Sequence, residues 1–153
     1  MTEVEVIRET YKTVHSSMNS LIKSVYRSIG SGIFGFVAYC FCFWYLYYIN
    51  NKDILLAACA TLSALLILLS VMLIGISLFG YYVLNQMMQL VQIIFDEQGE
   101  EYKELQKELQ KDFPLNNLYI WFYANSTLCN FFGSVISVIA ILGIIAVPIL
   151  VYK

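Results

Sequence analysis

Long apolar runs and amphipathic stretches alternate along the chain and divide it into four segments. Residues 1–30 are amphipathic, residues 31–83 contain two apolar runs, residues 84–130 are amphipathic again, and residues 131–153 form a third apolar run. Because helices of about 17–25 apolar residues can cross a bilayer, we predict an all-α membrane protein. Its three transmembrane helices continue outside the membrane as a helical, coiled-coil-like bundle.

The two apolar runs within residues 31–83 are predicted to form a transmembrane hairpin. The first span covers about residues 33–49 and the second about residues 54–83, and neither contains a charged side chain. Trp44 and several tyrosines crowd the end of the first span, where aromatic rings prefer the headgroup level. The short polar stretch between the runs, residues 50–53, is the expected turn.

The amphipathic segment 1–30 shows a heptad pattern, which predicts a helix with one apolar seam. The apolar residues recur at alternating spacings of three and four: Val4, Ile7, Tyr11, Val14, Met18, Leu21 and Val25. The same pattern predicts a second such helix over residues 84–112, with the seam Leu84, Met88, Val91, Phe95, Gln98, Tyr102, Leu105 and Leu109. Gly99 is the weak point of this second helix, since glycine favours a bend there.

The two seams predict that segments 2–30 and 84–112 continue the spans and pair antiparallel on the same side of the membrane. Pro114 cannot continue the preceding helix, so residues 113–117 form a turn. Residues 118–130 are expected to lead to the third span as another packed or interfacial helix. Residues 84–130 are therefore interpreted as a cytosolic helical hairpin.

Composition supports a membrane protein, because 59% of the residues are hydrophobic and only 13% are charged. Soluble domains carry about 45–50% apolar and about 25% charged residues. The lipid bilayer is thus the expected surrounding of the chain. The net charge of −2 predicts no basic face, so we expect no nucleic-acid partner.

The placement of basic residues predicts the orientation of the chain. Residues 1–30 hold four Lys or Arg and residues 84–130 hold three, whereas the opposite side holds only Lys52 and Lys153. We therefore expect the N-terminus in the cytosol and the C-terminus outside, and a bacterial inner (plasma) membrane as the location.

Motifs for chemistry are sparse, and we predict a protein that is not an enzyme and has no cofactor and no metal. The four cysteines have no metal-ligand spacing, and the single histidine has no acidic residue at ligand spacing on its face. The stretch 30–35 reads G-x-G-x-x-G but follows no strand. We interpret it as a flexible joint between the N-terminal helix and the first span.

Arg8 and His15 carry one weak alternative. They form Arg-x6-His, which resembles the Arg-x4-6-His signature of HEPN-type ribonucleases, in which the motif acts across a dimer. This resemblance implies a nuclease that uses Arg8 and His15. A structural role on the edge of the helix explains the same two residues.

Small and weakly polar residues mark the faces along which the spans can approach closely. In the third span and its approach they are Ser126, Asn130, Gly133, Ser137 and Ala140. In the second span they are Ala57, Ala60, Ala64, Ser70 and Ser77, and in the first Ser31 and Gly35. The stripe of the third span is either a helix interface or the lining of a narrow hydrated path.

Three hypotheses follow. The first is a self-associating, homo-oligomeric membrane effector or pore controlled through its cytosolic helices; the arrangement resembles small membrane proteins found beside bacterial anti-phage systems. The second is an accessory or immunity subunit that binds a larger membrane protein through the apolar segment 118–130 and the acidic residues Glu100, Glu101, Glu104 and Glu108. The third is the nuclease.

Overall fold

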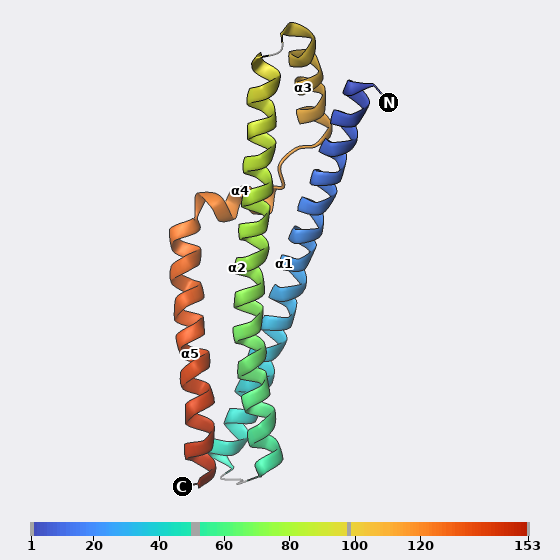
Figure 1. The fold of residues 1–153 in the computed structure, drawn as a ribbon. Coiled ribbons are helices and arrows are strands. Elements are labelled where there is room, and N and C mark those ends of the chain that lie inside the picture. Colours follow the sequence, from blue (N-terminus) through green and yellow to red (C-terminus); the bar gives the residue numbers. More distant parts are fainter. Residues whose placement is uncertain (1, 50–52, 98, 153) are drawn as a thin grey trace. The chain divides into compact units, whose positions relative to one another are not determined.

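The computed structural model describes residues 2–49, 53–97 and 99–152, and it contains five helices and no strand within these ranges (Figure 1). The helices are α1 Glu3–Tyr48, α2 Ile54–Glu97, α3 Glu100–Asp112, α4 Asn117–Ala124 and α5 Ser126–Tyr152. Residues 50–52 of the expected turn, the seam residue Gln98 and Lys153 lie outside the described residues. The prediction of an all-α chain is confirmed.

The chain divides into two compact units. Unit 1 comprises Met1–Ser24 and Ile76–Ala124, and unit 2 comprises Val25–Gly75 and Asn125–Lys153. Each of the two long helices contributes one part to unit 1 and one part to unit 2. Unit 1 therefore contains the amphipathic segments, and unit 2 contains most of the apolar runs.

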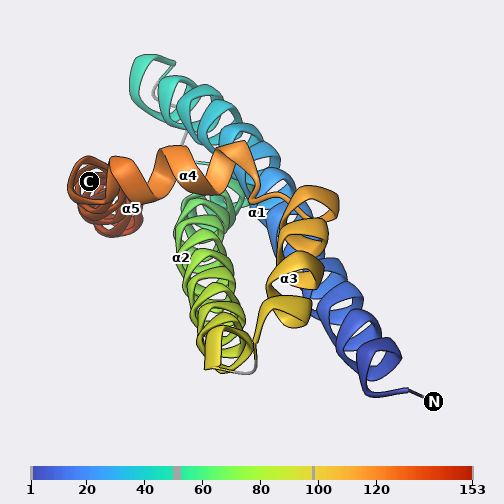
Figure 2. The same cartoon turned by 90° about the horizontal axis from the view of Figure 1, so that it is seen from above.

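The core of unit 1 is built from the two heptad seams. Seam residues of α1, α2 and α3 meet in one buried cluster, which Tyr119 of α4 completes. The buried members are Tyr11, Met18, Ile22, Tyr81, Met88, Leu105, Leu109 and Tyr119. Both seams are thus used within one chain, and the two views place α3 beside α1 and α2 (Figure 1, Figure 2).

A reversal at Gly99 corrects the expectation of one helix over residues 84–112. Helix α2 ends at Glu97, and α3 begins at Glu100 after Gly99, which has φ 112° and ψ −178°. This combination is essentially restricted to glycine. The chain turns back here, so that Leu105 and Leu109 enter the same cluster as Met88.

Helix α4 is held against α2 by a pair of buried tyrosines. The rings of Tyr81 and Tyr119 lie 4.2 Å apart between centroids, and both side chains are buried. The Tyr81 hydroxyl also accepts a hydrogen bond of 3.0 Å from the backbone N–H of Asn116. This bond fixes the turn that the sequence places after Pro114. Residues 126–130, expected to belong to the preceding segment, are the first turn of α5.

Unit 2 brings α1 and α2 together along a line of small residues. A methyl group on Gly35 would lie 3.1 Å from the Ser63 carbonyl oxygen, and the hydroxyls of Ser31 and Ser70 are 2.9 Å apart. The expected flexible joint at residues 30–35 is wrong, because α1 runs through this stretch as a continuous helix. Its glycines allow close packing of helices instead.

The outer surface of unit 2 is apolar. Large side chains on all three of its helices are more than half exposed; examples are Phe34 (70%), Leu62 (64%) and Leu142 (58%). Three helices, α1, α2 and α5, are long and apolar enough to cross a membrane. Unit 2 thus has the surface expected of a structure whose solvent is hydrocarbon.

Candidate functional site: an apolar cavity and the polar residues around it

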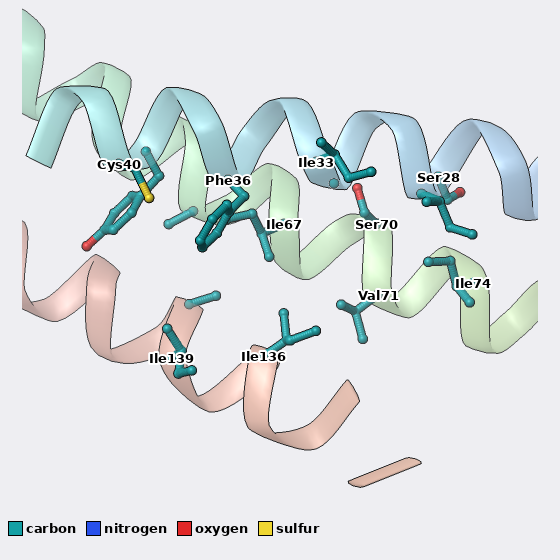
Figure 3. Close-up of a pocket in the computed structure, with 15 residues that line it drawn as sticks. Ser28, Ile33, Phe36, Cys40, Ile67, Ser70, Val71, Ile74, Ile136 and Ile139 are labelled. Carbon is teal, nitrogen blue, oxygen red and sulfur yellow. The ribbon is translucent and has the colours of Figure 1, made fainter. Parts of the chain in front are cut away.

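Unit 2 contains a cavity of about 630 Å³ between α1, α2 and α5. In Figure 3, Phe36, Ile67, Val71 and Ile136 extend into the space between the three helices. Ligand pockets in proteins typically measure about 300–1,000 Å³. The cavity is therefore large enough for a small organic molecule.

The convergence of α5 on its neighbours explains why the cavity forms. Val147 of α5 is buried against Cys42, Leu46 and Ala60 in a small core. Gly143 permits the close approach of Tyr39, since a methyl group on residue 143 would lie 2.6 Å from the Tyr39 hydroxyl oxygen. Nearer the start of α5 the helix packs less closely on α1 and α2, and the side chains of Ile136 and Ile139 line the cavity.

Ser28 lies in the wall of this cavity with a hydroxyl that has no hydrogen bond within the described residues. The residue is only 4% exposed. Four other serines of unit 2 differ from Ser28, because the hydroxyls of Ser63, Ser70, Ser134 and Ser137 each donate to the carbonyl four residues earlier at 2.8 Å. The Ser28 hydroxyl is thus a polar group of the cavity wall that is available to a ligand, whereas the Tyr39 hydroxyl, also in the wall, packs against Gly143.

The predicted stripe of α5 divides into two parts. Gly133 and Ala140 face the other helices of unit 2: a methyl group on Gly133 would lie 3.8 Å from Val71, and Ala140 is 5% exposed in the cavity wall. Ser137 is half-buried and donates to the Gly133 carbonyl. Ser126 and Asn130 are exposed. The structure therefore does not place all five residues on one free face.

Arg8 and His15 contact the returning chain of unit 1 rather than each other. The Arg8 guanidinium donates to the Glu108 carboxylate at 3.2 Å, and both side chains are about half exposed. His15 Nε2 lies 3.4 Å from the Pro114 carbonyl oxygen, and its Nδ1 lies 3.3 Å from the Asn19 amide nitrogen. A neutral ring protonated on Nε2 satisfies both contacts.

These contacts give both residues a structural explanation. The Phe113 ring packs 5.0 Å from the His15 ring between centroids, so the histidine supports the turn after α3. Exposed ion pairs such as Arg8–Glu108 contribute about 0–1 kcal/mol.

The acidic face of α3 is only partly available for docking. Glu100 and Glu104 are exposed, whereas Glu108 is the partner of Arg8. The side chain of Glu101 lies outside the described part of the structure.

In residues 2–49, 53–97 and 99–152, no three side chains of His, Cys, Asp or Glu gather closely enough to hold a metal ion. The four cysteines are free thiols.

The side chains that line the cavity of unit 2 are mostly apolar, so the cavity can bind an apolar molecule. We identify it as the candidate site of unit 2.

The cavity was not predicted from the sequence. Its lining residues are ordinary apolar positions of three spans, and periodicity shows which faces are apolar but not where two helices diverge. Comparisons of the chain with protein-family models, with curated proteins and with solved structures found no match.

Proposed function

We propose that the protein is a small, non-enzymatic integral membrane protein that self-associates as a membrane effector. Membrane insertion is supported by the outward-facing apolar surface of unit 2, exemplified by Phe34, Leu62 and Leu142. Leaving these side chains in water would cost about 25 cal/mol for each Å² of apolar surface. In a bilayer the same surface costs nothing.

Insertion is tested by extracting membranes that contain the protein with alkaline carbonate. The protein is expected to stay in the pellet and to dissolve only in detergent. Release by carbonate would contradict insertion.

The proposed self-association uses the exposed start of α5. The Asn130 carboxamide forms no hydrogen bond within the described residues, and Ser126 is exposed one turn earlier. Side-chain amides stabilise contacts between membrane helices by about 0.6–2 kcal/mol each. Copies of α5 that meet through Ser126 and Asn130 would satisfy both groups, and a ring of copies would line a path with them.

Native mass spectrometry after mild detergent extraction measures the number of subunits. A closed ring of four or more subunits is expected, with a shift toward smaller species in Asn130→Leu. Phe131→Leu, which changes an exposed neighbour in the same turn, is the matched control and should keep the ring. A monomer or simple dimer in the unmodified protein would contradict the homo-oligomeric pore.

The second candidate is an accessory subunit, favoured by the exposed carboxylates of Glu100 and Glu104 on α3. A monomer that co-purifies with a larger membrane protein, and loses it in a Glu100→Gln/Glu104→Gln variant, would support this candidate. The nuclease alternative requires cleavage of single-stranded RNA by the purified protein that His15→Ala abolishes while assembly stays intact.

A further inference from the structure

The lining of the unit 2 cavity selects an apolar ligand. The cavity is open on one side, and the residues that line it include Ile33, Phe36, Ile67, Val71, Ile74, Ile136 and Ile139. All belong to the three helices that are long and apolar enough to cross a membrane. An apolar cavity stays dry and is filled by hydrocarbon where hydrocarbon is present. A membrane is the place where acyl chains are most abundant.

The cavity is elongated along the helices. On α1 its lining extends from Ser28 to Cys40, which corresponds to about 18 Å at a rise of 1.5 Å per residue. In Figure 3, Ser28 lies toward one end and Cys40 toward the other, with Phe36 and Ile33 between them. A cavity of this length can hold a single extended chain along the helices.

The two ends of the cavity differ chemically. Ser28 and Ser70 lie toward one end, where the Ser70 hydroxyl is already bonded to Leu66 and Ser31. The Ser28 hydroxyl has a hydrogen to donate and no acceptor within the described residues. A carboxyl or ester carbonyl oxygen at this end would satisfy it. At the other end the lining includes Cys40 and Tyr39, whose hydroxyl oxygen packs against Gly143, and the residues between the two ends are apolar and would face methylene groups.

We propose that this cavity binds one long acyl chain that ends in a carboxyl or ester carbonyl group, with the carbonyl oxygen at Ser28 and the tail toward Cys40 and Ile139. The inference rests on the membrane insertion proposed above. It does not depend on self-association, because every lining residue comes from one chain.

The experiment uses the full-length protein in phosphatidylcholine vesicles and palmitic acid that carries a photoactivatable diazirine within its chain. A second arm uses a phospholipid with the same diazirine chain, so that capture of either probe shows the source of the acyl group. After illumination, mass spectrometry locates the adducts. We expect them on peptides that contain residues 28–40, 64–74 and 136–140.

Two variants test the geometry. Ile136→Trp fills the cavity and should lower adduct formation there about tenfold, whereas Ile145→Trp, an exposed position on the same helix outside the cavity, should leave it unchanged. Ser28→Ala removes the hydroxyl without changing the fold and should weaken capture about three- to tenfold, the usual effect of one hydrogen bond. Ser134→Ala, whose hydroxyl is bonded within α5, is its control.

Several outcomes would overturn the proposal. One is an even spread of adducts over outward-facing residues that Ile136→Trp does not change. Another is stronger, Ile136-dependent capture of a photoreactive isoprenoid, which would assign the cavity to a different ligand class. If Ile136→Trp fails to fold, the comparison of Ser28→Ala with Ser134→Ala decides. Carbonate release of the protein would refute insertion itself and is measured separately.

Discussion

Tyr119 illustrates how single residues hold unit 1 together. Its ring is 6% exposed and lies against Tyr81, with Tyr123 6.0 Å away between ring centroids. Burial, together with the neighbouring tyrosines Tyr123 and Tyr81, raises the pKa of Tyr119 above its ordinary value, and a hydrogen bond with Asn85 opposes this only in part. The folded protein therefore favours the neutral phenol.

This raised pKa predicts a loss of stability at high pH. Since the tyrosine pKa is about 10 in an unfolded chain, the stabilisation is complete below that pH and declines as the pH rises through the higher folded value. The midpoint of thermal unfolding in detergent, followed by circular dichroism from about pH 8 to pH 11, should fall. Tyr119→Phe should flatten the fall, and Tyr26→Phe, an exposed tyrosine of α1, should keep it. Equal slopes in both variants would contradict this assignment.

At single positions the sequence predicted which residues are buried better than it predicted which residues contact each other. The seam residues Tyr11, Met18 and Leu109 were predicted to be apolar contacts, and the structure buries all three. The pairing of Arg8 with Glu108 depends on the reversal at Gly99, which brings α3 beside α1. Spacing along one helix cannot reveal a partner one hundred residues away.

At the level of elements, the close approach of α1 and α2 depends on glycine. Gly35→Val would push branched methyl groups against the Ser63 carbonyl oxygen and the Ile67 side chain, and overpacking of this kind costs about 1–3 kcal/mol. Titration with sodium dodecyl sulfate in mixed micelles should show that loss in the free energy of unfolding. Gly75→Val is the matched control, because no atom lies within 4 Å of the added carbon. A similar effect of both variants would show that helix propensity, not packing, is responsible.

The reversal between α2 and α3 depends on another glycine for a different reason. Gly99→Ala forces a side chain into the φ 112°, ψ −178° region, which costs about 1–3 kcal/mol. The same detergent titration should show a destabilised protein. Gly30→Ala, within a helix and with open space around it, should instead stabilise by about 0.5–1 kcal/mol. If Gly99→Ala left the free energy of unfolding unchanged, the turn would have relaxed without cost.

Periodicity predicted the helices well and their ends less well. The heptad spacing continues through Gln98 and Gly99, so the pattern alone favoured one helix where the structure has α2 and α3. The opposite error occurred at residues 30–35, because glycines that favour a joint in water also allow helices to pack closely. In both places tertiary contacts determined whether the helix ends or continues.

For the whole molecule, the sequence predicted three apolar helices, and α1, α2 and α5 confirm them. The cavity could not be predicted, because it depends on the divergence of α5 from α1 and α2. The orientation predicted from Lys and Arg remains a prediction. It places the N-terminus in the cytosol and the C-terminus outside.

Single cysteines test this orientation in a variant whose four native cysteines are replaced. Glu9 and Tyr152 are both exposed, and they lie near opposite ends of the chain. A membrane-impermeant maleimide added to intact cells should label Tyr152→Cys and should reach Glu9→Cys only after the membrane is permeabilised. Labelling in the reverse order would show an inverted chain, and labelling of both in intact cells would contradict an odd number of crossings.

The turn at Gly99 also determines whether α3 is buried within its own chain or against a second molecule. If residues 97–100 became helical, α2 and α3 would form one rod, and Leu105 and Leu109 would leave the α1 surface of their own chain. These leucines could then be buried again only against α1 of a second molecule, which is a domain swap. Gly99 therefore acts as the hinge that keeps unit 1 closed within one chain, and substitutions there should favour interlocked dimers.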